Sequence, residues 1–211
     1  MTSLLGPGAI RDDHFHAHGV VESDAHLLVT AQAATRLLGG SSSALSSWRV
    51  AAGAFLEIVN EPLVPSGGAV CELRTTIDLA PTARVALLDV VSFSPAVPCR
   101  LRSQTLISLG GRAIAHDHFA ITRERDEESC AVGTYVFCDP SNRVSLEPLA
   151  AKLSGFERPD VRVGAGSLRG GGVLVRVLGP GPWAVRAALH GVRAVILKAA
   201  ELPAASPRGS L

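Results

Sequence analysis

The fold of this chain is decided by residues 27–70, which read LLVTAQAATRLLGGSSSALSSWRVAAGAFLEIVNEPLVPSGGAV. The run begins with small and β-branched residues and continues into the apolar segment Phe55–Val59, which one acid, Glu57, interrupts. We expect three strands here, joined in a single meander. Because side chains alternate between the two faces of a strand, Glu57 points away from its apolar neighbours, and strand geometry alone favours solvent for it. A carboxylate facing a core would need a partner or water.

The composition bounds the class of protein. The chain has 211 residues, of which 18% are charged, with 21 glycines and 13 prolines, and this is typical of many short strands joined by tight turns. We expect a single domain over residues 1–202 and a disordered tail over residues 203–211. The formal net charge of +1 provides no dense positive field, so neither nucleic acid nor a membrane is an expected partner.

The location expected from the sequence is the cytoplasm. No segment is uninterruptedly apolar over the ~18 residues that a membrane helix needs, and residues 1–18 lack the basic and apolar regions of a secretory signal. The cysteines are spaced too widely for a metal knuckle, and in a reducing compartment we expect free thiols in or near the core. These cysteines are Cys71, Cys99, Cys130 and Cys138.

Alternating and apolar runs predict strands along most of the chain, between turns rich in glycine, proline and serine. Residues 12–18 alternate strictly, and we expect this strand to form a hairpin with residues 25–30. Composition predicts a flexible turn at Gly39–Ser43, and no repeat of fixed period is evident. Helical spacing predicts a helix over residues 183–200, and one or two helical turns are expected at residues 148–153. The sequence therefore predicts an all-β dominated fold with a short helical part near the C-terminus.

Motifs for nucleotide binding or acyl transfer are missing from the sequence. Neither G-x-S-x-G, nor Walker A, nor G-x-G-x-x-G occurs between a strand and a helix, and Gly170–Gly172 leads into a strand. A strand after the glycines offers no helix N-terminus for a phosphate. We therefore do not expect this chain to bind a nucleotide.

Three histidines, His14, His16 and His18, share one face of the first strand. Neutral imidazoles at alternate positions can hold a divalent ion such as nickel, zinc or copper, whereas the competing interpretation is a wet, partly exposed strand face. The same histidines allow an alternative from another class, a cupin-like metal-dependent enzyme, because Glu22 follows them. The second cupin motif is not matched, since His190 lies in the helical segment with no asparagine after it.

Residues 29–70 carry an ordered set of motifs. The run VTAQAATRLL is followed by W-x-V-x-x-G-A-x-L-E at residues 48–57, then by Glu61–Pro65 and Gly68-Ala69. This order resembles the signature of the urease accessory protein family UreD, called UreH in some organisms. The sequence departs from the family at Asn60, where the family usually has proline. The residues that match the signature are Gln32, Ala34, Thr35, Leu56, Glu57, Pro62, Pro65, Gly68 and Ala69.

The resemblance implies layered sheets with a superhelical run of strands, and a short C-terminal helical part that contacts a partner. It implies a non-enzymatic scaffold in urease maturation, which binds the urease apoprotein, the accessory protein UreF and, through UreF, the GTPase UreG. It also implies that nickel passes along an internal route and that no cofactor is tightly bound. Such a route needs acids and water inside an apolar domain, so we expect Glu57, Asp89 or both to face a water-filled passage and to hold a divalent cation weakly.

Overall fold

The computed structural model describes residue 9, residues 11–95, 97–124 and 128–141, residue 149 and residues 152–203. Its strands are β1 (His14–Val21), β2 (His26–Thr30), β3 (Thr35–Leu37), β4 (Gly40–Val50), β5 (Phe55–Val59), β6 (Leu63–Pro65), β7 (Ala69–Leu79), β8 (Arg84–Phe93), β9 (Cys99–Leu109), β10 (Arg112–Arg123), β11 (Cys130–Cys138), β12 (Arg162–Ser167) and β13 (Gly172–Gly179). The helical elements are the 3₁₀ turn η1 (Ser154–Phe156) and the helix α2 (Pro182–Ala199). The strands form a five-stranded sheet of order β1-β4-β7-β9-β10 and an eight-stranded sheet, in which β12-β13-β11-β8-β5-β2 are joined by β3 and β6.

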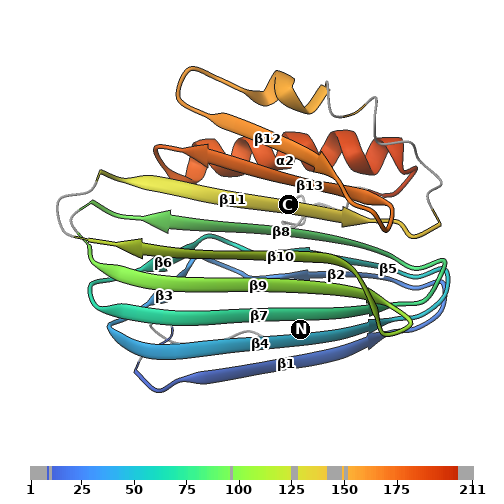
Figure 1. Cartoon of the computed structure of the whole chain (residues 1–211), viewed down its shortest axis with the longest axis horizontal. Coiled ribbons are helices and arrows are strands. Elements are labelled where there is room, and N and C mark those ends of the chain that lie inside the picture. Colours follow the sequence, from blue (N-terminus) through green and yellow to red (C-terminus); the bar gives the residue numbers. More distant parts are fainter. Residues whose placement is uncertain are drawn as a thin grey trace.

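The strands from β1 to β9 form a parallel solenoid. Strands β1, β4, β7 and β9 lie side by side in parallel in one sheet, and β2, β5 and β8 do so in the other (Figure 1). Neighbouring strands are one coil apart, so that His14 lies opposite Ser43, 29 positions later, and Ala69 lies opposite Cys99, 30 positions later. The expected meander and the hairpin of β1 with β2 are therefore wrong, and the chain does have a repeat of one coil.

Equivalent corners hold the coils in register. In each corner a buried aliphatic residue ends the first strand and an alanine precedes the second. The alanine N–H donates to the carbonyl three residues earlier, at 3.1, 3.2 and 2.9 Å in the successive coils. Coils that stack on one another bury the same positions, which is why the same residue types recur. The aliphatic residues are Val21, Val50 and Leu79, and the alanines are Ala25, Ala54 and Ala83.

Strand β4 runs straight through the glycine and serine cluster. It pairs in parallel with β1 on one side and with β7 on the other, and Ser42 is buried between its neighbours. The flexible turn expected at Gly39–Ser43 is wrong from Gly40 onwards. Pairing along both edges outweighs the low strand propensity of these residues, because strand stability is set mainly by neighbours.

The solenoid ends where the chain reverses direction between β9 and β10. Gly110 and Gly111 form the turn, with φ of 55° and 80°, a left-handed conformation that glycine adopts without strain. Strand β10 then runs antiparallel to β9, and β11 runs antiparallel to β8 and to β13. The C-terminal strands therefore widen the second sheet by antiparallel pairing.

Both faces of the eight-stranded sheet are covered. One face packs against α2, which lies along β11 and β13 (Figure 1), with Tyr135 and Leu189 fully buried between them. The other face packs against the five-stranded sheet through two hydrophobic clusters, one around Leu87 and one around Val91. The expected β-dominated class and the expected C-terminal helix are confirmed.

The four cysteines are free, as expected. Burial raises the pKa of the Cys71 thiol and raises the pKa of Cys138 to about 12, so both thiols stay protonated at neutral pH. Among the described residues, no helix combines the length and the apolar character needed to cross a membrane. The helical turns expected at residues 148–153 lie partly outside the described residues, and so does nearly all of the expected tail, residues 204–211.

Gly53 provides a test of the corner geometry. It has φ of +74° and its α-carbon faces the Asp24 side chain. A methyl group there meets both a left-handed backbone and Asp24, so Gly53→Ala is expected to lower the free energy of unfolding by about 1–2 kcal/mol, measured by urea denaturation. Gly67→Ala is the control, since the space beside Gly67 is open, and it should change stability by less than about 0.5 kcal/mol. Equal losses in both variants would contradict the corner geometry.

Candidate functional site

Glu57 lies at the centre of β5 and is fully buried beneath α2. Arg193 holds both of its carboxylate oxygens: Nε donates to Oε1 at 2.6 Å and Nη2 donates to Oε2 at 2.9 Å. The Nε2 atom of His26 lies 3.9 Å from Oε2. The solvent-facing position that strand geometry favours is therefore wrong, because α2 covers this face of the sheet and supplies the positive charge that a buried carboxylate requires.

A second buried ion pair lies about two helix turns away along α2. Glu61 is buried just after β5, and Nη2 of Arg186 donates to its Oε1 at 2.5 Å. Nε of Arg186 donates to Nε2 of His190 at 3.2 Å. Burial lowers the pKa of His190, and the charges of Arg186 and Arg193 lower it further, so this imidazole is a neutral acceptor at neutral pH.

These two ion pairs fix α2 against β5. Arg186 and Arg193 are seven residues apart and therefore lie on the same stripe of the helix, facing acids four residues apart in the sequence. Sequence reasoning missed both arginines, although helical spacing places them on the apolar face with Leu189. Burial, followed by the nearby charge of Glu57, raises the pKa of Tyr135, so its hydroxyl beside this pair stays protonated.

Asp89 lies on β8 and points to the opposite face of the sheet, toward the interior between the two sheets. Nδ2 of Asn60 donates to Asp89 Oδ1 at 2.6 Å. Asn60 thus gives this carboxylate a neutral partner. Glu57 and Asp89 are thus brought to different faces of one sheet and share no common site.

Asp89 belongs to a row of polar side chains that crosses the eight-stranded sheet. Asp89, Thr134 and Arg176 occupy neighbouring register positions on β8, β11 and β13. Arg176 donates through Nη1 to Thr134 Oγ1 at 2.5 Å and through Nη2 to Asp117 Oδ1 at 2.6 Å. Because Asp117 belongs to β10, this ion pair connects the two sheets, and the guanidinium also lies over the Phe119 ring at 4.8 Å.

The five-stranded sheet contributes a polar row of its own. Ser46, Thr75, Thr105 and Asp117 are neighbours in register on β4, β7, β9 and β10. Along β7 and β9, inward-pointing residues alternate with residues that point to solvent. Thr75 and Thr105 point inward, on the same face as Ile77. The two rows, together with Asn60, are called the polar layer below, and they separate the hydrophobic cluster around Leu87 from the cluster around Val91.

The environment of the polar layer changes the chemistry of Asp89. Burial raises the pKa of its carboxyl group, the hydrogen bond from Asn60 lowers it, and the charges of Asp117 and Arg176 act in opposite directions. The net shift is upward.

The polar layer could have been found from the sequence. Ser46, Thr75 and Thr105 are 29 and 30 residues apart, so a search for the coil repeat would have aligned them.

His14, His16 and His18 lie on the solvent side of β1, and all three are exposed. His14 Nδ1 is 2.8 Å from Ser43 Oγ on the next strand. Within the described residues, no three His, Cys, Asp or Glu side chains come together in a way that could hold a metal ion. The cupin-like alternative needs these histidines inside a barrel, and it is wrong because β1 is a parallel strand whose histidines point outward.

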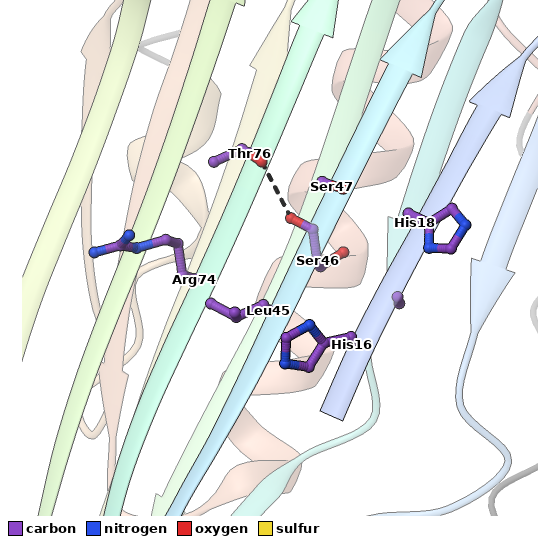
Figure 2. A pocket seen from close by; sticks show the side chains of 8 residues that line it. His16, His18, Leu45, Ser46, Ser47, Arg74 and Thr76 are labelled. Atoms are coloured by element: carbon purple, nitrogen blue, oxygen red, sulfur yellow. Dashed lines mark hydrogen bonds between the residues drawn. The ribbon is translucent and has the colours of Figure 1, made fainter. Parts of the chain in front are cut away.

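A shallow hollow of about 300 Å³ lies beside two of these histidines. It is lined by His16 and His18 on β1, by Leu45 on β4 and by Arg74 and Thr76 on β7, as Figure 2 shows. The guanidinium of Arg74 in this hollow disfavours a divalent cation by charge repulsion. The hollow is therefore better suited to an anionic group than to a metal ion.

The residues of the expected family signature trace one coil of the solenoid. Gln32 and Ala34 lie in the connection from β2 to β3, and Thr35 begins β3. Leu56 and Glu57 lie on β5, and the remaining positions frame β6 and the turn into β7, where Gly68 has φ of +74°. These remaining positions are Pro62, Pro65, Gly68 and Ala69.

Comparison with known proteins gives a consistent result. The family model of the UreD urease accessory protein matches residues 4–210. The chain is 30% identical to the urease accessory protein UreD of Sorangium cellulosum over 210 residues, which cover 91% of this chain and 66% of that protein. It is 33% identical to UreD of Streptomyces avermitilis over 119 residues, or 54% of this chain and 47% of that protein. It is 24% identical to UreD of Opitutus terrae over 218 residues, or 95% of this chain and 80% of that protein.

The pair of Glu57 with Arg193 is expected to show strong coupling. Arg193→Leu leaves the Glu57 charge buried without its partner, and the free energy of unfolding should fall by about 3–5 kcal/mol. The double variant Glu57→Leu/Arg193→Leu removes both charges and should lose less than either single variant. Urea denaturation of the wild type, the two single variants and the double variant gives the coupling energy.

The exposed pair Glu72–Arg74, 3.9 Å apart, is the control, and Glu72→Leu should lower the free energy of unfolding by less than about 0.5 kcal/mol. Additive losses would contradict the buried pair.

The raised pKa of Asp89 predicts a pH dependence of stability. The folded state binds this proton more tightly than the unfolded state, so the stabilisation linked to the proton is lost as pH rises through the folded pKa. Asp89→Asn cannot titrate and still accepts the hydrogen bond from Asn60. We expect the stability of the variant relative to the wild type to increase as pH rises from about 4 to 7. Urea denaturation across this range measures the difference, and a constant or decreasing difference would refute the assignment.

Proposed function

The chain belongs to the UreD urease accessory protein family, and on this basis we propose that it acts as a non-enzymatic scaffold in urease maturation. The chain spans 66% and 47% of the lengths of the Sorangium and Streptomyces relatives, so the partners and the cargo are part of the proposal. The proposed partners are the urease apoprotein, the accessory protein UreF and, through UreF, the GTPase UreG. The proposed location is the cytoplasm.

A scaffold role is supported by the shape of the solenoid. Parallel strands of up to 11 residues pair along their whole length and give the chain a long outer sheet. Buried ion pairs to Arg186 and Arg193 fix α2 against this framework. Such a body presents large surfaces that change little on binding, which suits a protein that positions other proteins.

We further propose that nickel, as cargo, passes through the interior along the polar layer. The observation that carries this proposal is the polar layer, which brings the Asp89 carboxylate, held by the neutral amide of Asn60, between two hydrophobic clusters. Oxygen ligands of this kind hold a divalent cation weakly and allow its release. Glu57 is assigned a structural role instead, because Arg193 takes both of its oxygens. No tightly bound cofactor is needed for this function.

The exposed histidines are proposed to serve contacts with a partner. His16 and His18 share their hollow with Arg74, whose positive charge opposes the binding of a nickel ion. His14 hydrogen-bonds to Ser43 and is not directed at a common point with the other two. A transient interaction with nickel at these histidines is therefore secondary to the polar layer in our proposal.

Co-expression with urease subunits and the other accessory proteins tests both parts. We expect the wild-type chain to be recovered in a complex with the urease apoprotein and UreF. We expect Asp89→Asn to be recovered equally well, because it folds stably, but to give several-fold less nickel per urease active site, measured by mass spectrometry. Glu157→Gln removes an exposed carboxylate and should leave both the complex and the nickel content unchanged.

The outcomes separate the two parts of the proposal. Failure of the wild-type chain to join either partner would refute the scaffold role. Normal nickel content with Asp89→Asn, in an intact complex, would refute the route along the polar layer and leave the scaffold role standing. The triple variant His14→Ala/His16→Ala/His18→Ala should load normal nickel once the complex has formed, and lost loading in an intact complex would assign the ion to the histidines.

A further inference from the structure

We propose that the solvent side of the five-stranded sheet is the surface on which this chain docks an acidic protein partner. This side, called the outer face below, carries the outward-pointing side chains of β1, β4, β7, β9 and β10. The inference rests on the proposed scaffold function and assigns a location and a chemistry to one of its contacts.

The register of the sheet places histidines at both edges of the outer face. Along one row, His16 on β1 lies opposite Leu45, which lies opposite Arg74, and the row ends at His118 on β10. In the neighbouring row, His18 and His116 occupy the two ends. These side chains are exposed, and an imidazole N–H can donate a hydrogen bond to a carboxylate. The face is therefore bordered by groups that interact favourably with carboxylates.

The centre of the outer face carries an excess of positive charge. Four exposed arginines lie on its central strands: Arg49, Arg74, Arg100 and Arg102. Only two acids point outward beside them, Glu72 and Asp78, both on β7. Glu72 already lies 3.9 Å from Arg74, and it is one of these acids.

The second acid, Asp78, is also engaged within the sheet. Its Oδ1 accepts from Ser108 Oγ at 2.8 Å and from the Gly111 N–H at 3.4 Å. Within the described part of the chain, no ion pair or hydrogen bond engages the guanidinium groups of Arg49, Arg100 and Arg102. The charge still available for a partner is therefore positive.

Apolar side chains are also concentrated on this face. Of the six large apolar side chains exposed among the described residues, three lie on it: Val20 at 56% exposure, Val70 at 46% and Leu45 at 37%. Leu45 lies halfway along β4, next to the edge strand β1, and between His16 and Arg74 (Figure 2). Apolar anchors surrounded by arginine and other polar groups are typical of protein–protein interfaces.

The dimensions suit a protein partner. Eleven-residue strands are ~33 Å long and five strands span ~19 Å, so the outer face covers roughly 600 Å², close to the ~800 Å² per partner of a standard interface. Nucleic acid is less well matched, because the arginines alternate with apolar residues and two acids, and the whole chain carries a net charge of only +1. An acidic protein surface satisfies both the charge and the apolar anchors.

Charge reversal on the outer face tests the inference. The probes are the purified urease apoprotein and purified UreF, each titrated against the 211-residue chain at low and high salt. Arg74→Glu/Arg102→Glu is expected to weaken binding of at least one probe by about tenfold, and wild-type binding of that probe should weaken as salt rises. Arg158→Glu/Arg162→Glu reverses two exposed arginines elsewhere and should leave the affinity within about twofold. Circular dichroism and thermal denaturation confirm that every variant is folded.

Other outcomes would overturn the inference. Wild-type affinity of Arg74→Glu/Arg102→Glu for both probes would place docking elsewhere and leave the scaffold function intact, whereas no binding of either probe by the wild type would refute both. A wild-type dimer that Leu45→Glu dissociates would identify a second copy of this chain as the occupant. Binding of duplex DNA or of anionic vesicles that the same charge reversal abolishes would show that the occupant is not an acidic protein.

Discussion

The step of 29 or 30 residues between neighbouring parallel strands is the constraint on which the rest of this structure depends. Because each coil lies on the preceding one in strict register, a residue type that recurs at this step becomes a row across a sheet. The buried aliphatic and alanine corners are rows of this kind. So is the polar row of Ser46, Thr75 and Thr105, which Asp117 extends onto the antiparallel strand β10.

Two embedded acids show how one sheet can serve two purposes. Glu57 faces α2 and is neutralised by Arg193, so its charge becomes a means of holding the helix in place. Asp89 faces the five-stranded sheet, where Asn60 gives it a neutral hydrogen-bond donor and its pKa is raised. A carboxylate held by a guanidinium is unavailable to a passing cation, whereas one held by an amide keeps an oxygen for it. One face of the sheet therefore attaches the helix, and the other carries the carboxylate on which the proposed nickel route depends.

The sequence was sufficient for the fold class and the C-terminal helix. It was insufficient for strand pairing, because strands β1 and β2 are close in the chain and short connections usually favour a hairpin. Composition misplaced a turn at Gly40–Ser43, since propensity does not include the neighbours on each side of β4. Arg193, the partner of Glu57, comes from far along the chain, and so do Asp117 and Arg176, whose charges act on Asp89. Alignment of the sequence with itself at a shift of 29 or 30 residues would have revealed the polar row.

The coil step also governs how this architecture tolerates changes in chain length. Side chains alternate with a period of two, so the loss of a single residue inside β7 would exchange its inner and outer faces, moving Arg74 inward and Ile77 outward. The gain or loss of an entire coil would preserve every row and only alter how many members each row has. Insertions in this family are thus expected to occur either as multiples of a coil or at corners, where they leave the alternation of the strands unchanged.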